Sequence, residues 1–399
     1  MKKIGVLYVY PSTYLAPSWT VCATVIRGLD QKRFAAYAVL DETAKDPKIG
    51  PEHATVYRYG IGCMLKQARR GNAISAGKLA VAIRRIVRDI REQGIDIVHC
   101  TDDFPSLSLG LLLARVSRTK LLINYHTIPT MYSGARLAVA RQCARAADLN
   151  VAVSRFVAKD IVSLGIDSKK VAFVMNGADP DVFRPGIDGG MIRAEYGIPT
   201  SAVLALQLAR IWQPKRQEDF VKALAIARRS DPSLYGLIVG WEDPRYFGAY
   251  GSYKEELIQI ARSEGVLDAL TIAPARPEAT QLHASADIFV LPSVNEPCAL
   301  VLFEAMATGK PVIGARSGGT PEIIVDGESG LLVAPRAPEE LAAALLLLAR
   351  DQELRSRLGQ AARLRIKEHL TEAHVAPGYA SVYEALVKGK AIPEEATAN

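Results

Sequence analysis

The chain has 399 residues, of which 49% are hydrophobic and 23% are charged, a composition ordinary for a globular protein. Because this length exceeds the size at which one hydrophobic core keeps growing, two domains of roughly 150–200 residues each are expected. The formal charge of +7 suits an anionic ligand or membrane surface but selects neither.

No stretch long enough to cross a bilayer is free of charged residues. The N-terminus runs from two lysines directly into an apolar segment, with no signal-like cleavage site. We therefore expect a cytoplasmic protein. The five cysteines lack the paired spacings of a zinc site or a redox dithiol, so buried free thiols are expected. They are Cys22, Cys63, Cys100, Cys143 and Cys298.

In the first half, apolar runs of strand length alternate with amphipathic stretches of helix length, which is typical of a parallel sheet covered by helices on both faces. Strands are predicted at residues 4–10, 35–40, 55–59, 96–100, 121–125, 149–153 and 171–175. Helices are predicted near residues 20–29, 75–93, 106–116, 135–146 and 154–163. These elements make one doubly wound domain.

The helix near residues 75–93 combines an apolar stripe with an arginine-rich face. The stripe consists of Ile83, Ile86, Val87 and Ile90, and the face carries Arg84, Arg85, Arg88 and Arg91. Such a face usually only solubilises the protein, and contact with an anionic membrane is the alternative.

Turn-forming residues concentrate between positions 176 and 190, as in a linker. The alternation then restarts, with strands predicted at residues 202–208, 237–239, 270–273, 288–291, 312–314 and 331–333. A second Rossmann-like domain is therefore expected. Two nucleotide signatures fail: residues 60–65 lack the last glycine of the dinucleotide fingerprint, and residues 76–79 lack the final Ser or Thr of a P-loop.

The most informative segment covers residues 291–313, where a buried strand, a short loop bearing Glu296 and an apolar helix follow one another. In open α/β sheets, ligands bind at this end of the strands, and a helix N-terminus offers free N–H groups to a phosphate. Glu296 and Glu304 are two helical turns apart, so they cannot form one acid/base pair. A ribose diol would supply the donors that the carboxylate of Glu304 needs among apolar neighbours. A capping or ion-paired glutamate is the alternative for either residue.

These two glutamates and the sequence that follows them resemble the signature of glycosyltransferase family 4. The resemblance is carried by residues 296–312, 318–324 and 326–333, and further by Ala209, Arg210, Lys215 and Ser154 and by residues 176–179 and 183–185. It spans most of the chain and is strongest between residues 206 and 333.

The resemblance implies a role for each matching residue. Arg210 and Lys215 would hold the donor diphosphate, Glu296 the hydroxyls of the donor sugar and Glu304 the ribose. Cys298, Ala299, Leu300 and Val301 would bind the donor, with the amides of Leu300 and Val301 meeting its phosphates. Arg276 would pack against the base, and His126 would lie near the transferred sugar. The chemistry agrees, because Arg and Lys neutralise a leaving group that gains negative charge. Without the motif, such cations usually face solvent, and a strand-end histidine is often structural.

The chain departs from the family pattern in two places. Residues 16–20 replace the usual glycine pair after the first strand, so Ser18 and Trp19 are expected on the acceptor side, with Trp19 as a wall of the acceptor pocket. Pro297, Cys298 and Ala299 replace a glycine-containing triplet, and the methyl group of Ala299 limits how closely backbone approaches a ligand.

The resemblance implies the GT-B fold, in which two Rossmann-like doubly wound α/β domains face a cleft. Residues 1–184 would form the acceptor-side domain and residues 185–372 the donor domain, while a C-terminal helix within residues 373–399 packs back on the first domain. The implied activity is retaining sugar transfer from a nucleoside diphosphate sugar, UDP favoured and GDP the alternative, with no metal or other cofactor. The acceptor is a small molecule, glycan or lipid, and no nucleic acid partner is expected.

Three other classes are weighed against this reading. A nucleotide-sugar epimerase of similar fold would share the phosphate-binding residues. A nucleotide-dependent oxidoreductase would need the missing glycine fingerprint, and a catalytically dead binding protein would lack Glu296 or Arg210, both of which are present.

Overall fold

The computed structural model describes residues 2–12, 17–44, 48–68, 70, 72–242, 247–248 and 251–393. The chain forms two compact units. The first unit comprises Met1–Asn176 together with Glu372–Asn399, and the second unit comprises Gly177–Thr371. The chain therefore enters the second unit after Asn176 rather than after residue 184, and it returns to the first unit at Glu372.

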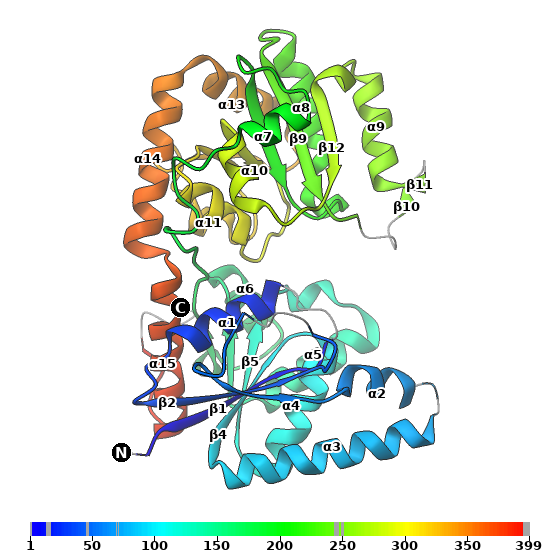
Figure 1. Ribbon diagram of the computed structural model, residues 1–399, viewed down its shortest axis with the longest axis vertical. Helices are drawn as coiled ribbons and strands as arrows, with labels where there is room; N and C mark the ends of the chain where they lie inside the picture. Colours follow the sequence, from blue (N-terminus) through cyan, green and yellow to red (C-terminus); the bar gives the residue numbers. More distant parts are fainter. Residues whose placement is uncertain are drawn as a thin grey trace. The chain divides into compact units, whose positions relative to one another are not determined.

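Among the described residues, the first unit has a seven-stranded parallel sheet in the order β3-β2-β1-β4-β5-β6-β7 (Figure 1). Its strands are β1 (Ile4–Tyr10), β2 (Phe34–Leu40), β3 (Thr55–Arg58), β4 (Ile95–Thr101), β5 (Lys120–Tyr125), β6 (Leu149–Ala152) and β7 (Val171–Phe173). Its helices are α1 (Pro17–Gly28), α2 (Ile61–Ala68), α3 (Ala73–Glu92), α4 (Phe104–Ser117), α5 (Gly134–Ala146), α6 (Arg155–Ser163) and α15 (Glu372–Lys388). Short 3-10 turns are η1 (Pro129–Met131) and η2 (Ser168–Lys170). All seven strands predicted in this half are present, whereas α2 was not predicted.

The sheet of the first unit buries side chains on both faces, as its continuous apolar strands require. From β1, Val6, Tyr8 and Tyr10 join a buried cluster with residues of α1 and α15. On the other face, α4 packs so closely on β4 that a Cβ atom at Gly110 would lie 2.8 Å from the sulfur of Cys100. The C-terminal helix α15 is thus part of the core of the first unit.

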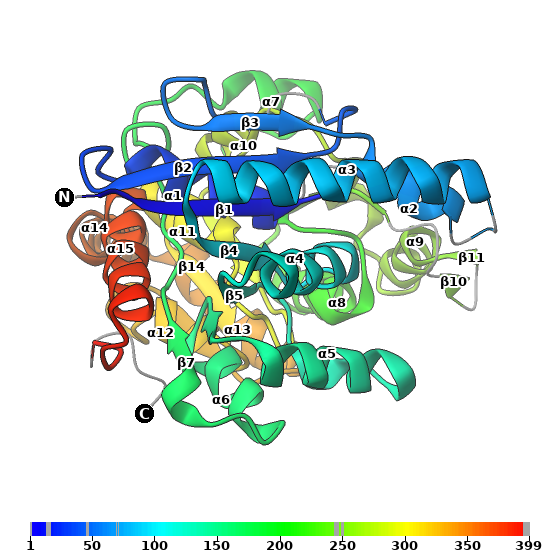
Figure 2. The same ribbon diagram turned by 90° about the horizontal axis from the view of Figure 1, so that it is seen from below.

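Helix α3 lies beside α4 (Figure 2), and its arginine-rich face is exposed to solvent. The predicted apolar stripe faces the protein, with Ile86, Val87 and Ile90 buried. The four predicted arginines are exposed, and so are Ile74 and Val81 in the N-terminal half of the helix. The exposed face is compatible with both roles considered for it, a solvated surface or a membrane contact. Within the described ranges, no helix is both long and apolar enough to cross a membrane.

In its described part, the second unit has a six-stranded parallel sheet in the order β12-β9-β8-β13-β14-β15. Its strands are β8 (Val203–Leu208), β9 (Leu234–Gly240), β12 (Leu270–Pro274), β13 (Ile288–Leu291), β14 (Val312–Ala315) and β15 (Leu331–Val333), with a small hairpin of β10 (Phe247–Gly248) and β11 (Gly251–Ser252). The helices are α7 (Gly190–Glu195), α8 (Gln217–Arg228), α9 (Tyr253–Ser263), α10 (Ala279–Ser285), α11 (Leu300–Ala307), α12 (Thr320–Ile323), α13 (Pro338–Arg350) and α14 (Gln352–His369), and the 3-10 turns are η3 (Gln213–Lys215) and η4 (Leu267–Ala269).

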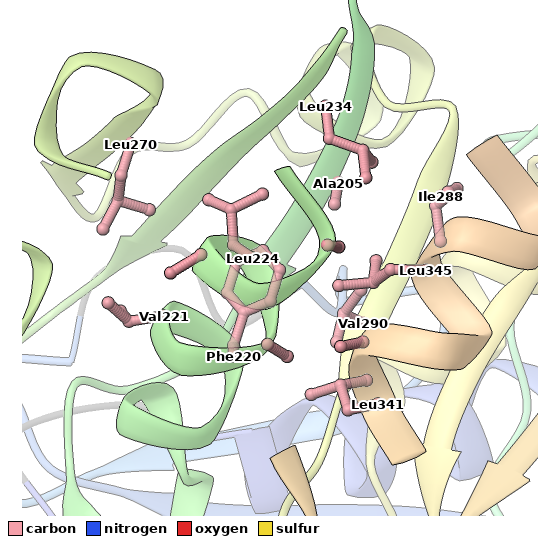
Figure 3. Close-up of a cluster of buried hydrophobic side chains, with 14 of the residues drawn as sticks. Ala205, Phe220, Val221, Leu224, Leu234, Leu270, Ile288, Val290, Leu341 and Leu345 are labelled. Carbon is pink, nitrogen blue, oxygen red and sulfur yellow. The ribbon is translucent and has the colours of Figure 1, made fainter. Parts of the chain in front are cut away.

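The core of the second unit lies between this sheet and the helices α8 and α13. Figure 3 shows Phe220 and Leu224 of α8 facing Leu341 and Leu345 of α13, with Val290 of β13 beside them. All five side chains are 0–1% exposed. Every strand predicted for this half is present, because buried parallel strands are continuous apolar runs that sequence patterns reveal directly.

The expected linker belongs to the second unit because it packs against the end of α14. The amide of Ala178 donates to the carbonyl oxygen of Leu370 at 3.1 Å. The guanidinium of Arg363 donates to the carbonyl oxygens of Pro180 and Phe183 at 3.3 and 3.2 Å. The turn-forming residues of this segment predict local conformation only, so the sequence did not predict these long-range hydrogen bonds.

Two buried tyrosines and a histidine connect α15 to the sheet of the first unit. The hydroxyl of Tyr383 lies 2.9 Å from the hydroxyl of Tyr8 and 2.7 Å from Nδ1 of His99. Burial lowers the pKa of His99 to about 3, so this imidazole is neutral at pH 7 and the network carries no charge.

We expect Tyr383→Phe to destabilise the first unit by about 1–3 kcal/mol, because it leaves buried polar groups of Tyr8 and His99 without their shared partner. Urea unfolding, with hydrogen exchange to assign the transition to the first unit, measures this loss. Tyr37→Phe is the matched control, since its hydroxyl is exposed and lies 3.5 Å from Gln93. Equal stability of the two variants would show that the network contributes nothing.

Candidate functional site

The motif residues of the second unit lie in loops that follow the carboxyl ends of parallel strands. Arg210 and Lys215 follow β8, and Glu296 follows β13. These two strands are neighbours, with Ile288 of β13 paired with Ala205 of β8. The structure therefore brings the two loops to the same edge of one sheet.

Lys215 and Glu296 form an ion pair in which Nζ of the lysine donates to Oε2 of the glutamate. The side chain of Glu296 is 8% exposed and that of Lys215 is 20% exposed. Backbone contacts hold the two loops together: the amide of Val294 donates to the carbonyl oxygen of Pro214 at 2.9 Å. In addition, the buried Gln207 side chain donates to the carbonyl oxygen of Lys215 at 2.8 Å. These bonds hold the backbone of the two loops from which the side chains of Lys215 and Glu296 extend.

A third loop, after β14, supports the backbone of Glu296. The amide of Gly319 donates to the carbonyl oxygen of Glu296 at 2.7 Å. Gly318 has a φ of +62°, and a Cβ atom there would lie 2.3 Å from that same oxygen. Asn295 also has a positive φ, and its amide donates to the hydroxyl of Ser317 at 3.0 Å. Glycine is needed at position 318 because there is no room for a side chain.

Helix α11 begins directly after this loop. Ala299 is its N-cap residue in extended conformation, and no side chain caps the helix. The first amides of a helix have no partner within the helix, so those of Leu300 and Val301 suit an anion. Cys298, just before the cap, is half-buried.

Glu304 is the fifth residue of α11, and its side chain is 22% exposed. Its Oε2 accepts a hydrogen bond from Nε2 of His283 at 3.1 Å. His283 is fully buried on α10, and its ring contacts Phe183 and Phe289. Part of the desolvation cost of this carboxylate is therefore compensated within the protein, and Oε1 remains the oxygen suited to a further donor such as a ribose hydroxyl.

Arg276 follows β12 and is engaged by acidic neighbours. Its guanidinium donates to Glu278 at 2.9 Å, to Glu195 at 2.8 Å and to the hydroxyl of Tyr196 at 3.1 Å. The bonds to Glu278, Glu195 and Tyr196 raise the pKa of Arg276. Arg276 thus connects the end of α7 to the loop after β12, and its contact with a base stays a prediction.

In the first unit, His126 follows the carboxyl end of β5. The amide nitrogen of Asn124 donates to the carbonyl oxygen of Val151 at 3.0 Å, so the amide oxygen faces the imidazole and accepts from Nε2 of His126 at 2.6 Å. Burial lowers the pKa of His126 to about 4, against a smaller opposing effect of Asp103. At pH 7 this histidine is neutral, and its Nδ1 can accept a hydrogen bond from a hydroxyl.

Ser18 and Trp19 differ from expectation, because they lie in the first turn of α1 rather than in a loop before it. Ala16, at the start of that expected loop, lies outside the described residues. The side chain of Trp19 is 1% exposed, with its ring 5.5 Å from that of Tyr10. Trp19 is therefore a core residue here and offers no surface to an acceptor. Ser18 is half-buried, with its hydroxyl 3.5 Å from that of Tyr10.

Two family models match this chain. The model described as Glycosyltransferase Family 4 matches residues 19–182, and that described as Glycosyl transferases group 1 matches residues 190–365. A D-inositol 3-phosphate glycosyltransferase of Nocardioides sp. is 31% identical over 73% of this chain and 69% of its own length. The chain belongs to glycosyltransferase family 4.

Two other relatives share a smaller part of their own length with this family 4 chain. A D-inositol 3-phosphate glycosyltransferase of Streptomyces bingchenggensis is 33% identical over 67% of the chain and 62% of its own length. The chain spans 49% of another such enzyme, from Segniliparus rotundus, at 34% identity.

Solved structures confirm the GT-B fold. The Anabaena HepE protein in complex with UDP and glucose has a TM-score of 0.80 at 21% identity, covering 96% of this chain and all of that one. Sucrose-phosphate synthase of Thermosynechococcus elongatus has a TM-score of 0.76 at 19% identity, and the match covers 97% of this chain and 100% of that one.

The sequence did not identify several residues that support this site. His283 lies 21 positions before Glu304, and no spacing rule connects them. Trp241 lies two positions after a predicted strand and beside Arg210, so its place near a strand end was the available signal. In the sequence Gly318 stands out only as part of a motif, whereas the structure shows that the loop of Glu296 leaves no room for a side chain at position 318.

We expect Gly318→Ala to lower donor turnover at least about tenfold, because its methyl group would displace the backbone that positions Glu296. Gly327→Ala is the matched control: φ there is +74°, but no atom lies within 4 Å of the new methyl group. Both variants pay the cost of a left-handed alanine, roughly 1–2 kcal/mol, which urea unfolding measures. Equal turnover in the two variants would contradict the proposed support of Glu296.

Proposed function

We propose that the protein is a retaining glycosyltransferase that moves a sugar from a nucleoside diphosphate sugar, UDP favoured, to an acceptor hydroxyl without a metal ion. One observation carries the proposal: the ion pair of half-buried Lys215 and buried Glu296 lies at the carboxyl edge of the second sheet, and Glu296 belongs to the loop that leads into the uncapped N-terminus of α11. This arrangement combines a cation, a carboxylate and free amides around one site.

Each of these groups has a task suited to its chemistry. Arg210, Lys215 and the amides of Leu300 and Val301 would hold the diphosphate and neutralise the charge that it gains on leaving. Glu296 would accept hydroxyls of the donor sugar through Oε1, and Glu304 would accept a ribose hydroxyl. Among the described residues, no group of three His, Cys, Asp or Glu side chains could hold a metal ion.

The proposed reaction is a front-face displacement. The bond between the anomeric carbon and the phosphate oxygen breaks while the bond to the acceptor oxygen forms on the same face. The proton of the acceptor hydroxyl passes to the leaving phosphate oxygen, so no side-chain base is required. The developing charge is on the diphosphate, which is where the cations are placed in this proposal.

The donor base is proposed from relatives. Anabaena HepE was crystallised with UDP and with UDP-glucose, which favours uridine as the base. The inositol phosphate relatives make a phosphorylated polyol one acceptor to test, alongside glycan and lipid acceptors.

A donor panel tests the function. UDP-glucose, UDP-galactose, UDP-N-acetylglucosamine, GDP-mannose and ADP-glucose are compared by thermal shift, since a ligand at 100 times its dissociation constant stabilises by about 2.7 kcal/mol. We expect a UDP-sugar to give the largest shift. We also expect donor turnover, or slow donor hydrolysis, to continue in excess EDTA, and the product to keep the anomeric configuration of the donor.

Different outcomes would contradict different parts. Loss of turnover in EDTA that magnesium or manganese restores would remove the metal-free mechanism. A larger thermal shift with GDP-mannose than with any UDP-sugar would show that the donor base is guanine rather than uracil. Conversion of the free sugar nucleotide to its epimer without an acceptor would support an epimerase, and an inverted product would exclude front-face displacement.

The two glutamates should have separable effects. Glu304→Ala should weaken the binding of UDP and of the full donor alike, by about 1–3 kcal/mol, because both ligands contain the ribose. Glu296→Ala should not weaken the binding of UDP, because the proposed ligand of Glu296 is the sugar and because the loss of this carboxylate frees Lys215. Donor turnover should nevertheless fall. Calorimetric titration of each variant with UDP measures the difference. If Glu296→Ala weakens UDP as much as Glu304→Ala does, Glu296 supports the phosphate loop instead of binding the sugar.

A further inference from the structure

Arg210 differs from the other cations of this region in what holds its guanidinium. Its Cζ lies 5.5 Å from the ring of Trp212 and 6.0 Å from the ring of Trp241, distances at which a cation is attracted to an aromatic face. Trp241 is 53% exposed, although a large apolar side chain normally gains by burial. Two of the three tryptophans of the chain thus flank one arginine.

The backbone keeps this grouping in place. The amide of Ala209 donates to the carbonyl oxygen of Val239 at 3.1 Å, and the amide of Ile211 donates to that of Trp241 at 2.9 Å. The strand pairing of β8 and β9 is thereby extended past Arg210. A Cβ atom at Gly240 would lie 1.8 Å from the carbonyl oxygen of Ala209, so only glycine permits this approach. On the other side, the Gln217 side chain donates to the carbonyl oxygen of Arg210 at 2.9 Å.

Neighbouring cations are held by carboxylates instead. Lys215 pairs with Glu296, Arg216 pairs with Glu218 and Asp219, and Arg276 pairs with Glu195 and Glu278. Within the described part of the chain, no carboxylate lies within ion-pair distance of Arg210. A carboxylate partner would occupy N–H donors of the guanidinium and repel an anionic ligand. A ring face orients the guanidinium while leaving the N–H donors at its edge available.

We propose that Trp212 and Trp241 are positioning residues that hold the guanidinium of Arg210 ready for the diphosphate of the donor. This inference rests on the proposed function, because it needs a nucleoside diphosphate in the second unit. The side chains act through Arg210 and need no contact with the donor. Their effect on binding should therefore disappear when Arg210 is absent.

The test is a double-mutant cycle measured by calorimetric titration with UDP, GDP and ADP. Trp241→Leu and Trp212→Leu should each lower the affinity for the diphosphate that binds the wild type best, by about two- to fivefold. Trp241→Phe, which keeps an aromatic face, should recover most of the loss. In an Arg210→Ala background, either tryptophan substitution should change affinity by less than about twofold.

Tyr235→Leu is the matched control. Arg228 lies over the ring of Tyr235 at 5.1 Å, but Tyr235 is near the start of β9, at the opposite end of the strand from Trp241. It should leave diphosphate affinity unchanged while removing a similar arginine–aromatic contact.

The outcomes separate the two proposals. A wild type that binds none of the three diphosphates would contradict the proposed function. If the wild type binds but both leucine variants bind as tightly, the positioning role is wrong and the proposed function stands. A loss that persists unchanged in the Arg210→Ala background would show that the indoles contact the ligand or only stabilise the loops, and would also overturn the positioning role.

Discussion

The ion pair between Lys215 and Glu296 is the interaction on which the geometry of the candidate site depends. It connects the loops after β8 and β13, which become neighbours only because these strands pair in the sheet. Removing two charges from water can cost more than their attraction returns. We infer that the value of the pair lies in geometry rather than stability, since it fixes a cation and a carboxylate where the α11 amides begin.

The two cations of the motif are therefore prepared in different ways. Lys215 is paired with Glu296, so a diphosphate bound as we propose would have to compete with a carboxylate for its ammonium group. Arg210 is held by ring faces and keeps its charge uncompensated among the described residues. Charge in a loop at a sheet edge attracts anions over a longer range than a neutral pair does. Under the proposed function, we therefore infer that Arg210 would make the first contact with the diphosphate and that Lys215 would contact it once the donor is bound.

The sequence predicted both sheets because the strands are short, largely apolar runs separated by stretches of helix length, and it predicted the motif residues because they stand in short recognisable segments. It missed α2, whose first residues were considered only as a failed glycine fingerprint. It placed the boundary of the second unit near residue 184, since the bonds from Ala178 and Arg363 join positions far apart in the chain. The Lys215–Glu296 pair was not predicted for the same reason: 81 positions separate its members, and only the order of the strands brings them together.

The return of the chain at Glu372 has a physical consequence for the first unit. Its core cluster contains Val375, Tyr379 and Tyr383 of α15, and Gly28 of α1 approaches this helix so closely that a Cβ atom would lie 2.5 Å from the Cβ atom of Ala376. Residues 1–176 without α15 would leave that face of the sheet uncovered, at a cost of several buried aromatic side chains. The first unit therefore completes its core only after the second unit has been synthesised, which makes the second unit an insertion between β7 and α15 rather than an independent C-terminal addition.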